Sequence, residues 1–116
     1  MGSYQQYLNR ESMDAAKAFV IGKPFKGKLT DIETYNNGWG MFFHGNCIAA
    51  RRDGYIVFCL QNWTSRTTLA RLNAVCTLLW GEPRFRQEKG RIWFGPGFLR
   101  EVEPLEKIKL PIEVTP

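Results

Sequence analysis

The 116-residue sequence predicts an α+β fold in a single domain, residues 1–116. We expect a four-stranded antiparallel meander, followed by a helix packed on one face of it and a C-terminal β-hairpin, with a short N-terminal helix. Three observations predict this class. Regular turn signals divide residues 29–60 into segments rich in aromatic and β-branched residues, an apolar period of the helical kind runs through residues 66–80, and the length leaves room for one core.

The helix is predicted after Thr64 or Ser65, either of which can cap the free amides of its first turn. Gly81 ends it and Pro83 prevents its continuation. Its apolar stripe consists of Leu69, Leu72, Val75, Cys76 and Leu79. The polar positions Arg66, Arg71 and Asn73 are placed on its other faces.

Turn signals at Asn37-Gly38, Gly45-Asn46 and Asp53-Gly54 predict strands at residues 29–36, 39–44, 47–52 and 55–60. Two-residue loops fix the register, and the register sorts side chains between two faces. The face predicted to receive the helix carries Ile32, Thr34, Trp39, Met41, Phe43, Ile48, Ala50, Val57 and Cys59. The opposite face carries Glu33, Tyr35, Phe42, His44, Cys47, Ala49, Arg51, Ile56, Phe58 and Leu60.

The two ends of the chain are predicted to be less regular. Ser12 is expected to cap a short helix over residues 13–20, while residues 1–11 and 99–116 are expected to be extended or loosely held. Proline occurs three times in the tail, which favours an extended chain covering a sheet edge. No apolar run is long enough to span a bilayer and no secretory signal is present, so no membrane partner and a cytoplasmic location are expected.

Catalytic and metal-binding motifs are weak. His44, Cys47, Cys59 and Cys76 would form a zinc set by residue type, but the predicted register puts Cys47 and Cys59 on opposite faces. Three cysteines without a C-x-x-C pair favour free thiols in a reducing compartment. A single histidine without an orienting group offers no nucleophile–base pair. We therefore expect a protein that is not an enzyme, without catalytic residues, cofactor or metal.

The second sheet face is the first candidate binding surface. Tyr35, Phe42 and Phe58 are grouped there with Arg51, and aromatic residues with arginine are typical of interface hot spots. The face is too apolar to be left to water alone. The alternatives for its cover are the N-terminal helix, the proline-containing tail, a second copy of the chain in a homodimer, or a partner protein.

The hairpin at residues 84–94 is the second candidate surface. Arg84, Arg86, Lys89 and Arg91 are interleaved with aromatic residues, and the net charge of the chain is +5. Such a ribbon can follow a phosphate backbone, so the alternative function is nucleic-acid binding. The structural interpretation is an edge hairpin protected by charge against aggregation.

Three segments carry a family resemblance. They are His44-Gly45-Asn46-x-Ile48-Ala49-x-Arg51, then Trp63-Thr64-Ser65-Arg66-Thr67-Thr68-x-x-Arg71-Leu72-Asn73-Ala74, and then Gln87-x-x-Gly90-x-x-Trp93-Phe94. Together they cover about half of the chain, and they resemble a family of small proteins encoded by tailed bacteriophages. The resemblance implies a viral protein that acts in the host bacterial cytoplasm on a host, viral or defence protein. It carries over no catalytic residues, and the tail after Phe98 departs from the pattern.

Overall fold

The computed structural model describes residues 10–62, 65–95, 97 and 100–112, and it confirms the α+β class. The helices are α1 (Arg10–Ile21) and α2 (Arg66–Trp80). The strands are β1 (Phe25–Lys26), β2 (Thr30–Tyr35), β3 (Gly38–Phe43), β4 (Asn46–Arg52), β5 (Tyr55–Cys59), β6 (Phe85–Glu88), β7 (Arg91–Phe94), β8 (Arg100–Val102) and β9 (Lys107–Pro111). One antiparallel sheet has the order β1-β2-β3-β4-β5-β9, and a smaller one has the order β6-β7-β8.

Helix α2 lies where the sequence predicted it. Its N-cap is Ser65, whose side chain accepts a hydrogen bond from the Thr68 amide, and Gly81 ends it in the left-handed conformation. Leu72 is completely buried, as the apolar stripe predicted. Arg71 and Asn73, which the sequence placed outside the apolar stripe, are also buried.

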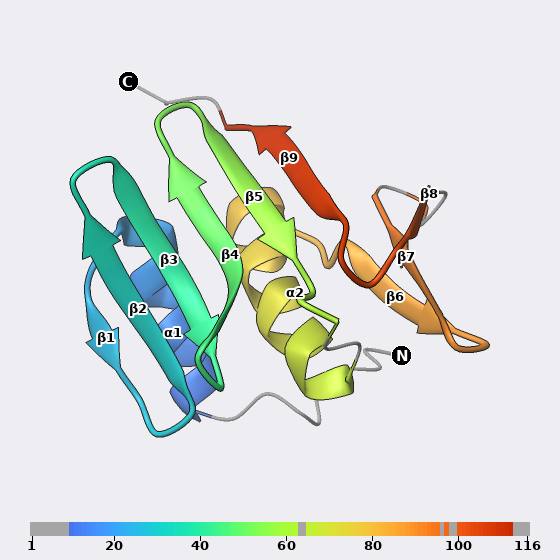
Figure 1. Cartoon of the computed structure of the whole chain (residues 1–116), viewed down its shortest axis with the longest axis horizontal. Helices are drawn as coiled ribbons and strands as arrows, with labels where there is room; N and C mark the ends of the chain where they lie inside the picture. The colour runs from blue at the N-terminus through green and yellow to red at the C-terminus, as the bar shows by residue number, and fades with distance from the viewer. Residues whose placement is uncertain (1–9, 63–64, 96, 98–99, 113–116) are drawn as a thin grey trace.

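Helices α1 and α2 lie side by side against one face of the six-stranded sheet, which we call the inner face (Figure 1). Trp39 on β3 joins this face to the end of α1. Its indole nitrogen donates a 2.6 Å hydrogen bond to the Phe19 carbonyl, and its ring packs on Gly22, where a β-carbon would lie 2.9 Å from the ring. The end of α1 is therefore fixed to the sheet by one tryptophan.

The predicted register is wrong from the β3–β4 turn onward, because the turn was predicted at Gly45-Asn46, and the predicted faces are wrong from Ala49 onward. The β3–β4 hairpin turns at His44-Gly45, so Phe43 pairs with Asn46. A bulge then follows, because Phe42 pairs with Cys47 whereas Met41 pairs with Ala49. Ile48 is the extra residue. The bulge reverses the faces of every later position, which places Ile56 and Phe58 on the inner face, where both are completely buried.

The smaller sheet attaches to the larger one through an aromatic cluster centred on Phe58. The centroid of the Phe58 ring lies 5.5 Å from that of Phe85 and 6.3 Å from those of Phe94 and Trp80. Asn73 adds a polar link, because its side-chain oxygen accepts from the Arg84 and Phe85 amides and its side-chain nitrogen donates to the Phe85 carbonyl. One helix thus supports both sheets.

The ends of the chain contain more regular structure than the sequence indicated. Helix α1 begins at Arg10, and Ser12 is a buried residue within it rather than its cap. In the tail, β9 pairs with β5 over five positions, from Cys59–Lys107 to Tyr55–Pro111, and forms one edge of the larger sheet. Among the described residues, neither helix is long and apolar enough to cross a membrane.

Candidate functional site

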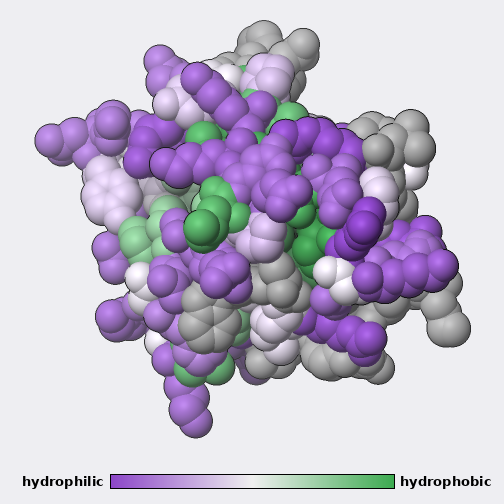
Figure 2. Space-filling view, turned by 45° about the vertical axis from the view of Figure 1, so that its right-hand side comes forward, coloured by the Kyte–Doolittle hydropathy of each residue, from purple (hydrophilic) through white to green (hydrophobic). Residues whose placement is uncertain are grey.

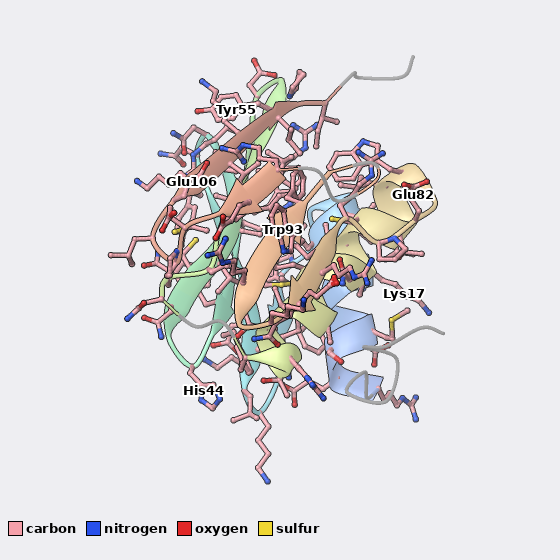
Figure 3. All side chains as sticks on the ribbon, turned by 90° about the vertical axis from the view of Figure 1, so that its right-hand side faces the viewer. Lys17, His44, Tyr55, Glu82, Trp93 and Glu106 are labelled. Carbon is pink, nitrogen blue, oxygen red and sulfur yellow. The ribbon has the colours of Figure 1, made fainter. Side chains whose placement is uncertain are left out.

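The face of the larger sheet that points away from the helices, which we call the outer face, is the strongest candidate surface. Figure 1 looks onto it, and no helix or strand of the described residues crosses it. The bulged register assigns to it Lys26, Asp31, Glu33, Tyr35, Gly40, Phe42, Cys47, Ala50, Arg52, Tyr55, Val57, Cys59, Lys107 and Lys109. Viewed from the side, Tyr55 lies with the sheet and Lys17 lies with the helices on the far side (Figure 3).

Apolar side chains occupy the middle of the outer face. Tyr35 is 44% exposed. Phe42, Tyr55 and Val57 are half-buried although no other layer of the described structure covers them. Two aromatic rings of this face contact cations, Lys109 at 4.1 Å from the Tyr55 ring and Arg52 at 6.0 Å from the Tyr35 ring. Tyrosine and arginine, which occur together at Tyr35 and Arg52, are enriched in interface hot spots.

The four residues predicted to bind a partner do not share one face. Tyr35 and Phe42 lie on the outer face, as predicted. Phe58 is completely buried in the core, and Arg51 lies on the inner face with its guanidinium 5.8 Å from the Trp39 ring. The bulge at Ile48 causes both corrections, because it moves each side chain after it to the opposite face.

A shallow hollow of about 290 Å³ lies on the outer face between β4, β5 and the start of β9. Its lining consists of Cys47, Ile48, Ala49, Ala50, Arg52, Tyr55, Val57, Cys59, Gln61 and Lys107. Two of these residues are cations and none is a carboxylate. The volume is at the lower end for small-molecule sites, and it suits one or two anchoring side chains of a protein partner.

Cys47 and Cys59 both lie on the outer face beside this hollow, so their predicted separation onto opposite faces is wrong. Burial raises the pKa of Cys47, and its thiol donates to the Ala49 carbonyl. Burial raises the pKa of Cys76 on α2 to about 12. Both thiols therefore stay protonated at neutral pH, which does not suit a nucleophile. No group of three metal-binding side chains occurs among the described residues.

The arginines of the predicted basic hairpin lie close to carboxylates. Arg86 is 3.3 Å from Glu88, Arg91 is 3.6 Å from Glu101, and the Arg84 guanidinium lies over the Trp80 ring and 3.8 Å from Glu82. Lys89 is exposed at the tip of the hairpin. The structure thus places these four cations on one hairpin, as predicted, but it also brings glutamates to three of them.

A polar cluster that no sequence pattern predicted joins α1, β2 and α2. The Arg71 side chain donates to the Thr30 hydroxyl at 2.8 Å and to the Thr67 carbonyl, and its guanidinium lies 4.0 Å from the Phe43 ring. The Glu11 carboxylate accepts from the amides of Lys28, Leu29 and Thr30. Desolvation alone would raise the pKa of Glu11, but these hydrogen bonds outweigh it and hold the pKa below its usual value. This cluster fixes the loop before β2 and is structural.

Comparison with known proteins identifies one relationship. The family model described as Kyanoviridae Gp96 protein matches residues 9–103, which is most of the chain and includes both helices and strands β1 to β8. No curated protein and no solved structure matches the chain.

Proposed function

The chain belongs to the Kyanoviridae Gp96 family of bacteriophage proteins, and on this basis we propose that it is a non-enzymatic binding module that attaches to a host or viral protein in the cytoplasm of the infected bacterium. A defence protein of the host belongs to this partner class. The outer face is the proposed contact surface. The observation that supports it most is a half-exposed aromatic surface on a sheet whose other face is already covered by two helices.

The composition of the outer face favours a protein partner. An antiparallel sheet with one wet face normally alternates apolar and polar positions, with the polar ones outward. Here Phe42, Tyr55 and Val57 point outward instead, and the hydrophilic surface is interrupted by separate hydrophobic areas (Figure 2). Contact with a partner would remove this apolar area from water, which favours the complex.

Nucleic-acid binding through Arg84, Arg86, Lys89 and Arg91 is the alternative function. The nearby Glu82, Glu88 and Glu101 reduce the positive potential that a phosphate backbone would meet at this hairpin. An enzyme is the third alternative. Two observations argue against it. The Cys47 thiol donates to a backbone carbonyl rather than to a base, and His44 is exposed at a hairpin turn.

A capture experiment tests the proposed function. The tagged chain is incubated with a lysate of the host bacterium, with and without nuclease, and bound proteins are identified by mass spectrometry. We expect a protein partner that survives nuclease, and we expect Tyr35→Ser and Phe42→Ser to lose it. Leu78→Ser is the matched control, because Leu78 is a similarly exposed apolar residue, 41% accessible, on α2. Loss of every partner after nuclease treatment would favour the nucleic-acid alternative.

A further inference from the structure

We infer that the hollow between β4, β5 and β9 takes an acidic segment of a partner protein, with an apolar side chain of that segment seated between the cations. This inference rests on the proposed function and names the partner's chemistry at the same face. Charge is distributed unequally over the outer face.

Cations gather around the hollow. Arg52 and Lys107 line it, and Lys109 lies next to Lys107 on the same face of β9, opposite Val57. Lys107 and Lys109 are both exposed. Among the described residues, no carboxylate lines the hollow. The carboxylates of the outer face, Asp31 and Glu33, are on β2 and are separated from the hollow by β3, and Lys26 is 3.3 Å from Asp31. The hollow therefore lies in the positive half of the face.

The floor of the hollow is apolar and small in scale. Ala50, Val57 and Cys59 form it between the strands, and the Tyr55 ring with Lys109 above it bounds one end. A carboxylate reaching this rim would meet two or three ammonium or guanidinium groups, while a neighbouring leucine or phenylalanine would displace water from the floor. Opposite charges that meet across an interface steer association and fix its register.

A nucleic-acid strand fits this surface less well. Phosphates would have to cross toward Asp31 and Glu33 to extend beyond the hollow, and those carboxylates would repel them. A second copy of the chain also fits less well, because the outer face carries four cations, Lys26, Arg52, Lys107 and Lys109, against two carboxylates, Asp31 and Glu33. Two such faces would bring an excess of like charge together. Both are outcomes that the test distinguishes.

The test uses purified full-length chain and labelled probes, measured by fluorescence anisotropy. The acidic probe is a short peptide in which glutamates alternate with leucines around a central phenylalanine. The basic probe replaces each glutamate by lysine, and the third probe is a single-stranded oligonucleotide. We expect the acidic peptide to bind, the basic peptide not to bind, and the affinity for the acidic peptide to fall about tenfold or more between low and high salt.

Matched double variants locate the site. K107E/K109E should weaken binding of the acidic peptide about tenfold or more, because it reverses the exposed cations of β9. K17E/K23E is the control, because it makes the same change in net charge at exposed residues in and just after α1 and should leave the affinity unchanged. Circular dichroism checks that both variants are folded, and sedimentation shows whether the chain self-associates.

Several results would overturn the inference. The acidic and basic peptides could bind with equal affinity, or both double variants could lose the same affinity for the acidic peptide. The oligonucleotide could bind more tightly than the acidic peptide and be weakened by K107E/K109E, or the chain could form a dimer that K107E/K109E dissociates.

Failure of this inference is distinguishable from failure of the proposed function. If the acidic peptide does not bind but Tyr35→Ser and Phe42→Ser still abolish capture of a nuclease-resistant protein, the outer face remains the contact surface and only the partner's chemistry is wrong.

Discussion

The inner and outer faces of the larger sheet both carry aromatic and aliphatic side chains, but the helices cover only the inner face. The inner face carries Ile32, Met41, Ile56 and Phe58, each no more than 2% exposed beneath α1 and α2. The outer face carries Phe42, Tyr55 and Val57, which are only half-buried. The difference shows that apolar content alone does not identify the core side of a sheet, because a face without a covering layer can also carry aromatic side chains.

The largest difference in the free energy of unfolding is expected between variants of two neighbouring residues on β5, Phe58 on the inner face and Val57 on the outer face. Phe58→Ala should lower the free energy of unfolding by about 3–5 kcal/mol, because it leaves a cavity between α2 and both sheets. Val57→Ala, one residue earlier and on the outer face, should cost about 1 kcal/mol or less, since its side chain is already half in water. Urea denaturation measures both. The reverse order would mean that the bulge is absent and the register predicted from the turns is right.

Helix α2 gives a second comparison, between its buried and exposed sides. Leu72→Ala should cost about 2–5 kcal/mol, because Leu72 is completely buried. Leu78→Ala on the same helix should change the stability by less than about 0.5 kcal/mol, because Leu78 is 41% exposed. The melting temperatures of the two variants provide the measurement. An unchanged melting temperature for Leu72→Ala would contradict the observed helix phase.

Local signals in the sequence predicted the elements well. The Ser65 cap, the Gly81 stop and the alternation of β-branched and aromatic residues depend on neighbours within a few positions, and α2 and β2 to β5 appear within one or two residues of their predicted bounds. Tyr35 and Phe42 were placed on the correct face because they precede the bulge. The chemistry of that face could therefore be read only in part from sequence.

Other features depend on contacts that no local pattern records. The bulge at Ile48 places Ile56 and Phe58 in the core, and the two-residue turn rule predicts no bulge. Strand β9 pairs with a strand that precedes it by about fifty residues, so the rim of cations at the hollow appears only after folding. The helical period placed Arg71 and Asn73 outside the apolar stripe but did not predict their burial. Each of them satisfies buried partners on other elements.

Acid should lower the stability of the fold through Glu11, whose hydrogen bonds tie α1 to the loop before β2 on the helix-covered side of the sheet. The folded pKa of Glu11 is lowered, so its contribution is present above the unfolded value of about 4.5 and is lost as the pH falls through the folded pKa. Glu11→Gln should cost about 1–2 kcal/mol at neutral pH and weaken the decline in stability below pH 4.5. Denaturation between neutral pH and about pH 3 measures it. A stability–pH curve parallel to that of the unmodified chain would show that Glu11 is not the group responsible.

The smallest effect on stability is expected at the β6–β7 hairpin. Its arginines lie close to glutamates, whereas no carboxylate of the described residues lines the hollow of the outer face. Arg86→Ala with Arg91→Ala removes two exposed ion pairs, to Glu88 and Glu101, and exposed pairs contribute about 0–1 kcal/mol each. We expect the double variant to melt within a few degrees of the unmodified chain and to capture the same partner.

If the hairpin instead binds a phosphate backbone, oligonucleotide affinity should fall steeply with salt. The log–log slope should be about −0.9 per phosphate contacted on duplex DNA, and the double variant should make the slope shallower by about two contacts. A salt titration with a duplex and with a single strand measures the slope. Because Glu82, Glu88 and Glu101 lie within 4 Å of three of the arginines, we expect weak binding and a shallow slope at this hairpin. A steep slope that depends on Arg86 and Arg91 would move the functional site from the outer face to the hairpin.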